Sequence, residues 1–130
     1  MPPNHPFRVL LVDDAAELRL FVKLELEESG RFSVVAEAGD GASAAELAEL
    51  HQPDLVLLDI AMPVQDGLEA LPRIRRASPS TRIVMLSAFE EHRFGASALE
   101  LGASAYVEKG VPSEELVARL AEIMGEPVSP

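Results

Sequence analysis

The sequence predicts an α/β fold, a doubly wound parallel sheet of five strands built from five strand–helix units in a single domain. Short apolar segments rich in Val, Ile and Leu alternate with segments whose apolar residues recur every three or four positions, the pattern of helices that cover a parallel sheet. The runs at residues 9–12 and 55–58 lack polar alternation, which is typical of strands buried on both faces. The length of 130 residues suits one domain with its own core.

The strands are predicted from short apolar runs bounded by polar or turn residues. They are expected at residues 7–12, 32–38, 55–59, 82–87 and 105–108. The third run ends in Asp59 and is expected to form a central strand, because four apolar residues precede the carboxylate. Asp40 and Gly41 follow the second strand and are interpreted as a turn.

The helices are predicted from apolar stripes at helical spacing between these strands. The stripes are Leu18, Phe21, Val22 and Leu26; Ala45, Leu47, Ala48 and Leu50; Leu68, Leu71 and Ile74 within residues 67–77; Phe94, Ala98 and Leu101 within 94–101; and Leu116, Val117, Leu120 and Ile123 within 113–124. Gly30, Gly102 and Gly125 stand where helices are expected to end, and Ser113 where the last begins. Residues 7–124 are expected to form the domain, with residues 1–6 as a disordered tail and 125–130 as a tail or the start of a linker.

Composition excludes several classes of function. Eleven Lys and Arg against 22 Asp and Glu give a net charge of −11, so nucleic-acid binding through this domain is not expected, because phosphate contacts need clustered cations. A membrane role is disfavoured as well, since no apolar run approaches the ~18 residues of a membrane span. Without cysteine, the chain has no disulfide, thiolate zinc site or cysteine nucleophile. A cytoplasmic location is expected.

The candidate functional residues follow the predicted strands. Open parallel sheets carry their sites beyond the carboxyl ends of the strands, and those ends offer Asp13, Asp14, Asp59, Ser87 and Lys109. Taken singly, the Asp pair is a helix cap, Ser87 begins a turn and Lys109 is a solvated side chain. Taken together, carboxylates gathered at one edge repel one another unless a cation is bound. Oxygen ligands, with no cysteine and only scattered histidines, favour Mg²⁺ over zinc.

This set of residues suits the handling of a phosphoryl group. Carboxylate-bound magnesium with a neighbouring ammonium and hydroxyl can grip phosphoryl oxygens. Because the sequence has no Gly-rich phosphate loop, the acceptor must be a side chain, and a carboxylate can serve as the nucleophile and become an aspartyl phosphate. Asp59 is the candidate acceptor, since Asp13 and Asp14 are better placed to hold the metal.

Five separated blocks carry a family resemblance. They are residues 10–14 (LLVDD), 53–63 (PDLVLLDIAMP), 66–69 (DGLE), 83–88 (IVMLSA) and 102–109 (GASAYVEK). In this order and spacing the chain resembles, from about Arg8 to Ile123, the receiver domain of bacterial two-component response regulators. The blocks are most similar to those of receivers that precede a helix-turn-helix DNA-binding output.

The resemblance implies a flavodoxin-like fold and a signalling switch controlled by phosphorylation. Asp59 is then the residue that accepts a phosphoryl group from a sensor histidine kinase. Asp13 and Asp14 are expected to hold Mg²⁺, for which Mn²⁺ can substitute, together with Asp59 and the main-chain carbonyl of Ala61.

The same resemblance implies that Lys109 bridges to the phosphoryl oxygens and that the Ser87 hydroxyl bonds one of them. With Asp59, these residues are expected to catalyse the domain's own phosphorylation from a phosphodonor and its own dephosphorylation, rather than a metabolic reaction. Tyr106 is expected to follow Ser87 and alter the face formed by the fourth helix, fifth strand and fifth helix. Expected partners are the kinase and a second copy of the chain, through that face or another helical one; DNA is expected only through an output domain beyond residue 130.

Some positions depart from the family pattern. Gly110 follows Lys109 where Pro through a cis peptide is frequent, and we expect a trans peptide or an adaptable loop there, because a cis bond before Gly costs about 3 kcal/mol. Ser87 stands where Thr is commonest. Phe89 lies two residues beyond Ser87, where an apolar ring is expected to restrict water.

Other functions remain as alternatives. A receiver-like scaffold could bind partners without phosphorylation, although every site position holds a competent residue type. A small phosphatase with an Asp-x-Asp motif needs an acid at Ala15, and a flavodoxin needs phosphate donors where Asp13 and Asp14 repel phosphate. Tyr106, considered without the family, is a half-buried edge aromatic.

Overall fold

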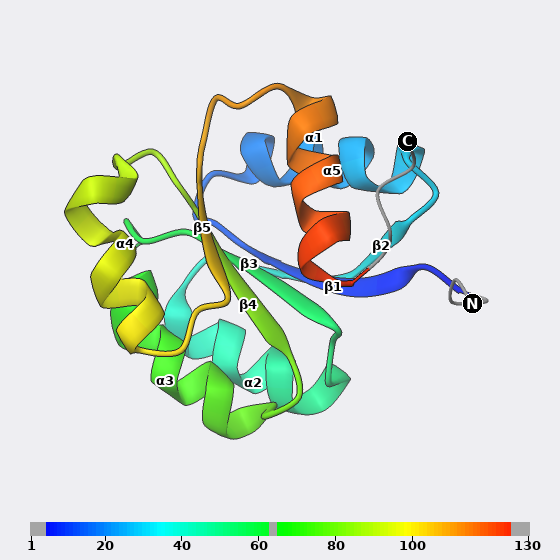
Figure 1. The fold of residues 1–130 in the computed structure, drawn as a ribbon. Coiled ribbons are helices and arrows are strands. Elements are labelled where there is room, and N and C mark those ends of the chain that lie inside the picture. The colour runs from blue at the N-terminus through cyan, green and yellow to red at the C-terminus, as the bar shows by residue number, and fades with distance from the viewer. Residues whose placement is uncertain (1–4, 63–64, 126–130) are drawn as a thin grey trace.

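The computed structural model describes residues 5–62 and 65–125. In that part of the chain, strands and helices alternate from one end to the other (Figure 1). The strands are β1 (Phe7–Val12), β2 (Phe32–Ala38), β3 (Leu55–Leu58), β4 (Arg82–Ser87) and β5 (Ala105–Glu108). The helices are α1 (Ala16–Glu28), α2 (Gly41–His51), α3 (Gly67–Ala77), α4 (Glu91–Glu100) and α5 (Ser113–Ile123).

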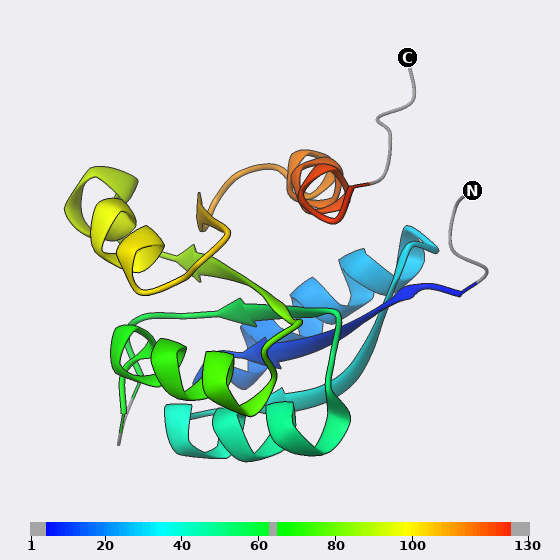
Figure 2. The same ribbon diagram turned by 60° about the horizontal axis from the view of Figure 1, so that its bottom comes forward.

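The strands form one parallel sheet in the order β2-β1-β3-β4-β5. Helices α1 and α5 cover one face, and α2, α3 and α4 cover the other (Figures 1 and 2). This arrangement confirms the predicted doubly wound fold and the central place of β3. The chain runs outward from β1 to β2 and returns to β3 on the other side of β1, so the switch point of the topology lies between β1 and β3.

Alternation along the strands builds a core on each face of the sheet. Leu10 and Val12 of β1 pack with the helices α2, α3 and α4, whereas Val9 and Leu11 pack with α1 and α5. Every residue of β3 is buried. The continuous apolar runs therefore reflect strands covered on both sides, as predicted.

Three residues of the predicted helical stripes lie outside the core. Phe21, Leu50 and Leu101 are 56%, 75% and 39% exposed. In α1, fewer residues are buried than the apolar stripe contains. Val22 and Leu26 pack in the core on this face of the sheet, whereas the adjacent position Phe21 lies on a different side of the helix.

Several element boundaries differ from the predictions. Asp40 does not form a separate turn: it caps α2, and its carboxylate accepts a hydrogen bond of 2.8 Å from the main-chain N–H of Ser43. Helix α4 begins at Glu91, three residues before the predicted start at residue 94, and the carboxylate of Glu108 accepts a hydrogen bond of 3.1 Å from the Glu91 N–H. Strand β3 and helix α5 each end one residue early.

The predicted helix-ending glycines are confirmed, since all three have positive φ angles; they are Gly30, Gly102 and Gly125. Residues 1–4, 63–64 and 126–130 lie outside the described part of the chain, so the tails at residues 1–6 and 125–130 stay predictions. Among the described residues, no helix has the length and apolar character needed to span a bilayer.

Candidate functional site

The pairing of β1 with β3 brings Asp13 and Asp59 together. Val12 and Leu58 are register partners, and each strand is followed at once by its aspartate. The Asp59 N–H donates to the Val12 carbonyl at 2.9 Å, and the Asp13 N–H donates to the carbonyl of Ala38 at 3.0 Å. The sheet hydrogen bonding therefore continues into both aspartates and fixes their main chains.

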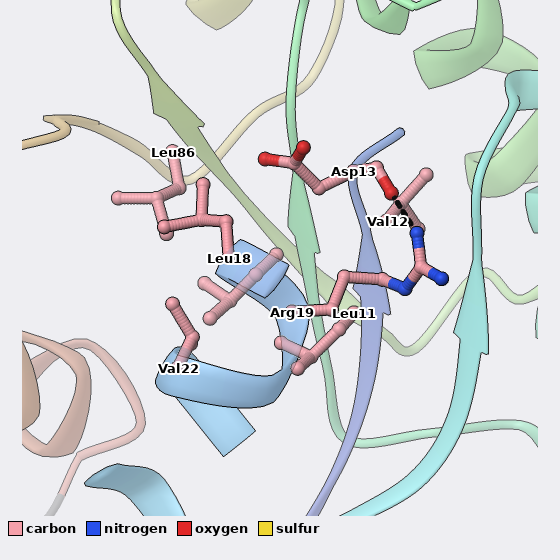
Figure 3. A pocket seen from close by; sticks show the side chains of 8 residues that line it. Leu11, Val12, Asp13, Leu18, Arg19, Val22 and Leu86 are labelled. Carbon is pink, nitrogen blue, oxygen red and sulfur yellow. Dashed lines mark hydrogen bonds between the residues drawn. The ribbon is translucent and has the colours of Figure 1, made fainter. Parts of the chain in front are cut away.

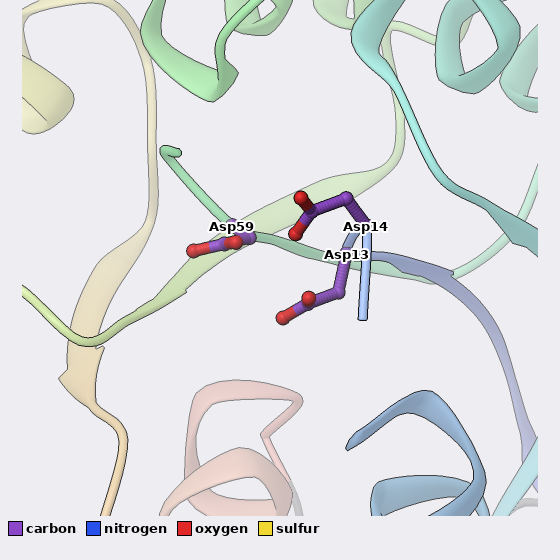
Figure 4. A group of neighbouring side chains, drawn as sticks. All are labelled: Asp13, Asp14 and Asp59. Carbon is purple, nitrogen blue, oxygen red and sulfur yellow. The ribbon is translucent and has the colours of Figure 1, made fainter. Parts of the chain in front are cut away.

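Three carboxylates converge at this point. Oxygen atoms of Asp13, Asp14 and Asp59 all lie within 4.8 Å of one another (Figure 4). Asp13 and Asp59 are buried, whereas Asp14 is exposed. The structure does not support the interpretation of the pair as a helix cap: Ala15 is the capping position of α1, and Asp13 Oδ1 instead accepts a hydrogen bond of 2.9 Å from the Ala15 N–H.

Lys109 enters the cluster from the end of β5. Its Nζ lies 2.7 Å from Asp13 Oδ2 and 3.4 Å from Asp59 Oδ1, so it is not the solvated side chain that a lone lysine suggests. Its main-chain N–H donates to the Ser87 carbonyl at 2.7 Å, which ties the ends of β4 and β5 together. Gly110 follows in a trans peptide with a φ of 103°, as expected, so Lys109 reaches the carboxylates without a following proline.

The cluster is under electrostatic strain. The pKa of Asp59 is raised above its ordinary value, first by burial and then by the negative charge of Asp13. Lys109 opposes these effects, as does the Ile60 N–H, which donates to Asp59 Oδ1 at 2.9 Å. Three carboxylates against one ammonium leave an excess of negative charge. The candidate metal ligands in this cluster are all carboxylate oxygen atoms, the type of ligand that a hard dication such as Mg²⁺ prefers.

This strain predicts that removing one charge stabilises the metal-free protein. With EDTA present, we expect Asp59→Asn to raise the free energy of unfolding near neutral pH by about 1 kcal/mol. A raised pKa in the folded state means that the fold penalises the ionised form. The penalty is absent below the ordinary pKa of 3.8 and grows as the pH rises through the raised value.

Urea unfolding at a series of pH values checks this prediction. The two proteins should differ little in acid and most at neutral pH. Asp14→Asn is the matched control, because Asp14 is exposed and its charge is better solvated. A lower urea midpoint for Asp59→Asn at neutral pH would mean that the Asp59 carboxylate stabilises the fold.

The two predicted switch residues bind the same loop residue. Ser87 is fully buried at the end of β4, and its Oγ accepts a hydrogen bond of 3.1 Å from the N–H of Phe89. The Tyr106 hydroxyl donates to the carbonyl of Phe89 at 2.8 Å. Tyr106 lies on the edge strand β5, as the alternative interpretation expected, but it is 3% exposed and therefore buried rather than half-buried. The β4–α4 loop thus joins Ser87 to Tyr106.

Phe89 belongs to an aromatic cluster beside the site. Its ring lies 5.1 Å from that of Phe94, and the guanidinium of Arg93 stacks 5.2 Å from both rings. Ala61, the expected main-chain ligand, lies exposed in the loop after β3.

Two supporting residues were not assigned a role from the sequence. Arg19 of α1 donates from Nη1 to the main-chain oxygen of Asp13. Gly67, at the start of α3, packs against the main chain of Asp59, where an added Cβ would lie 1.9 Å from the Asp59 carbonyl oxygen. In the sequence, only the presence of a glycine in the first turn of a predicted helix points to the contact between Gly67 and Asp59. Nothing in the spacing of residues along the chain points to the contact between Arg19 and Asp13.

Comparison with known proteins places this geometry in context. The family model of the response regulator receiver domain matches residues 9–121. The chain is 40% identical over 110 residues to the chemotaxis protein CheY of Bacillus subtilis, covering 85% of this chain and 91% of that protein. It is 42% identical over 114 residues to the transcriptional regulatory protein PdtaR of Mycobacterium tuberculosis, covering 86% of this chain. These matches bear out the resemblance seen in the sequence.

A solved structure is similar over nearly the whole chain. It is the CheX–CheY–BeF₃–Mg²⁺ complex from Borrelia burgdorferi, with a TM-score of 0.87 and 27% identity, covering 94% of this chain and 92% of that one. The present chain spans only 54% of the length of PdtaR, although it spans most of CheY.

Proposed function

This chain belongs to the response regulator receiver family and is a phosphorylation-controlled signalling switch, and on that premise we propose that Asp59 is its phosphoryl acceptor. The observation that supports this choice most strongly is the position of Asp59: it directly follows the central strand β3, is 5% exposed, and lies beside Asp13 with its Oδ1 3.4 Å from Lys109 Nζ. Asp14 is exposed, and Asp13 is engaged by Lys109 at 2.7 Å.

The proposed reaction is a transfer of one phosphoryl group. A carboxylate oxygen of Asp59 attacks the phosphorus of a phosphodonor and forms a new P–O bond, while the bond between phosphorus and the donor breaks and its electron pair leaves with the donor. The product is an aspartyl phosphate. Receiver domains obtain this group from histidine kinases, where the breaking bond joins phosphorus to an imidazole nitrogen.

We propose that Asp13, Asp14, Asp59 and the main-chain carbonyl of Ala61 hold Mg²⁺, for which Mn²⁺ can substitute. Receiver domains bind Mg²⁺ at an acidic cluster of this kind. The crowding of three carboxylates, the raised pKa of Asp59 and the all-oxygen donor set support the assignment. The bound dication supplies positive charge that stabilises the phosphoryl oxygens during transfer.

Two further side chains complete the proposed site. The ammonium of Lys109, held by Asp13 and Asp59, is available to bind a phosphoryl oxygen. The Ser87 Oγ accepts a hydrogen bond from the Phe89 N–H, which leaves its own proton free to donate to a second phosphoryl oxygen.

The proposed output runs through Phe89. A phosphoryl group that draws the Ser87 hydroxyl toward it weakens the bond from the Phe89 N–H, and the Phe89 carbonyl is also where Tyr106 is bound. Movement of this loop therefore releases Tyr106 and alters the face formed by α4, β5 and α5. We propose that this face, or another helical face, binds a second copy of the chain, and that the regulated output is transcription. DNA contact would then belong to an output domain, where one follows residue 130, and not to this domain. A scaffold that works without phosphorylation is not favoured.

Incubation with acetyl phosphate and Mg²⁺ tests the proposed acceptor. The intact mass of the unsubstituted protein is expected to increase by one phosphoryl group, and EDTA is expected to suppress the reaction. Asp59→Asn should remain unmodified. Asp54→Asn is the matched control, because Asp54 accepts a hydrogen bond of 2.8 Å from the Arg8 N–H just before β3, at the opposite edge of the sheet. Modification of Asp59→Asn to the same extent would place the acceptor elsewhere.

A further inference from the structure

We propose that Arg19 is a positioning residue for the acidic cluster: its guanidinium binds the main-chain oxygen of Asp13 and the carboxylate of Glu37, and so holds the β1–α1 loop in the conformation that directs Asp13 and Asp14 toward Asp59. This inference rests on the proposed role of the cluster as a Mg²⁺ site. Arg19 itself is not a ligand and does not contact the reacting atoms.

The guanidinium connects three parts of the fold. Arg19 lies in the first turns of α1, its Nη1 donates to the main-chain oxygen of Asp13, and its Nε donates to Glu37 Oε1 on β2 at 3.1 Å. The Arg19 side chain is only 20% exposed. Gly39 lies beside the guanidinium, since a Cβ added there would be in ordinary van der Waals contact with Nη1 at 3.7 Å. The contact is thus partly enclosed, which favours a fixed geometry.

The bond acts on the far side of Asp13 from its carboxylate. Figure 3 shows the main-chain oxygen of Asp13 directed to Arg19, while the carboxylate points away from the guanidinium. That oxygen belongs to the peptide joining Asp13 to Asp14, so holding the peptide sets the direction of both Cα–Cβ bonds. Asp14 is exposed and has little packing to orient it. Its approach to Asp59 therefore depends on the loop backbone.

The positioning role and the effect of charge alone predict opposite changes in Mg²⁺ affinity when Arg19 is replaced. A cation near a Mg²⁺ site repels the dication, so an arginine that acted only through its charge would weaken metal binding, and its removal would tighten it. An arginine that only stabilised the fold would leave the affinity of the folded protein unchanged. A residue that orients the ligands strengthens binding, and loss of such supporting contacts typically weakens metal affinity about 10- to 100-fold.

Isothermal titration of Mg²⁺ into the full chain separates these three cases. We expect Arg19→Met, which keeps the aliphatic length but removes every donor, to weaken Mg²⁺ binding at least about tenfold. Arg19→Lys keeps the charge and one donor and should recover part of the loss. Gln52→Ala is the stability control: Gln52 Nε2 donates to the Ala77 carbonyl at 2.9 Å, away from the cluster, so its loss should lower the urea midpoint without changing the Mg²⁺ affinity.

A metal-free measurement separates failure of this inference from failure of the Mg²⁺ site. The Ala15 N–H donates to Asp13 Oδ1, so we expect its hydrogen exchange to be faster in Arg19→Met and unchanged in Gln52→Ala. Equal or tighter Mg²⁺ binding by Arg19→Met, or unchanged exchange at Ala15, would overturn the positioning role. If the unsubstituted protein binds no Mg²⁺ while exchange still responds to Arg19, the metal site is wrong and the role of Arg19 in holding the loop stands.

Discussion

The Lys109→Met variant is expected to be about 2 kcal/mol less stable than the unsubstituted protein when divalent cations are absent, and to recover most of that loss in saturating Mg²⁺. Lys109 Nζ lies 2.7 Å from Asp13 Oδ2 and 3.4 Å from Asp59 Oδ1. Without the ammonium, two buried carboxylates lose a shared counter-ion while Asp14 remains beside them. Removing one partner of a buried ion pair leaves an uncompensated charge, which costs more than the pair contributes.

Urea unfolding in EDTA and in Mg²⁺ measures both parts of this prediction. Lys23→Met is the matched control, because Lys23 lies in the middle of α1 rather than at the end of a strand, and the change should alter stability little under either condition. An equal loss of stability with and without Mg²⁺ would show that Lys109 contributes packing rather than charge.

Phosphorylation separates the two roles of Lys109. Where Mg²⁺ restores the stability of Lys109→Met, the rate of modification by acetyl phosphate should still fall about 100-fold, because a preorganised donor to the transferred group is missing. The single-turnover rate at saturating Mg²⁺ measures this effect. A rate equal to that of the unsubstituted protein would remove Lys109 from the catalytic residues.

The residues that end strands could be predicted from the sequence. Asp13, Asp59 and Ser87 each directly follow an apolar run, and Lys109 follows the short run at residues 105–107 after Glu108. The carboxyl ends of parallel strands share one edge of a sheet. Val12 and Leu58 are register partners, so the residues that follow them, Asp13 and Asp59, lie next to each other in space. The fold and the family were predicted correctly for the same reason, since both depend on short, strongly patterned segments.

Contacts made across the fold could not be predicted in this way. Arg19 reads as an ordinary polar position of an amphipathic helix, and its bond to Asp13 depends on how α1 leaves the sheet. The exposure of Phe21 equally depends on which face α1 turns toward the sheet, since Val22 and Leu26 are buried there and Phe21 is not. Glu108 precedes Lys109 in the sequence, yet its carboxylate binds the first turn of α4 because β5 passes beside that helix. Each of these features depends on how helices and strands pack in three dimensions, which the apolar periodicity of the sequence does not specify.

Gly67→Ala is expected to destabilise the protein by about 3 kcal/mol and to weaken Mg²⁺ binding, although it adds a single methyl group. The added Cβ would lie 1.9 Å from the carbonyl oxygen of Asp59 and 3.0 Å from the Cα of Ile60. The Gly67 N–H also donates to the Ile60 carbonyl at 2.8 Å, which holds the two segments in contact. Both neighbours are main chain, so relief of the overlap must shift the start of α3 and the segment that holds Asp59 apart from each other.

Gly95→Ala is the matched control, because Gly95 also lies in a helix and its added Cβ would meet the Cγ of Glu91 at 2.9 Å. A glutamate side chain can rotate away, and alanine favours a helix over glycine by up to about 1 kcal/mol, so this change should be nearly neutral. Gly67 is not among the glycines with positive φ, so strain of the backbone conformation does not account for a difference between the two variants. Urea midpoints and Mg²⁺ titrations of both variants compare them directly. If Gly67→Ala matched Gly95→Ala in both measurements, the start of α3 would not be what fixes the main chain of Asp59, and the loop after β3 would have to adapt without moving the acceptor.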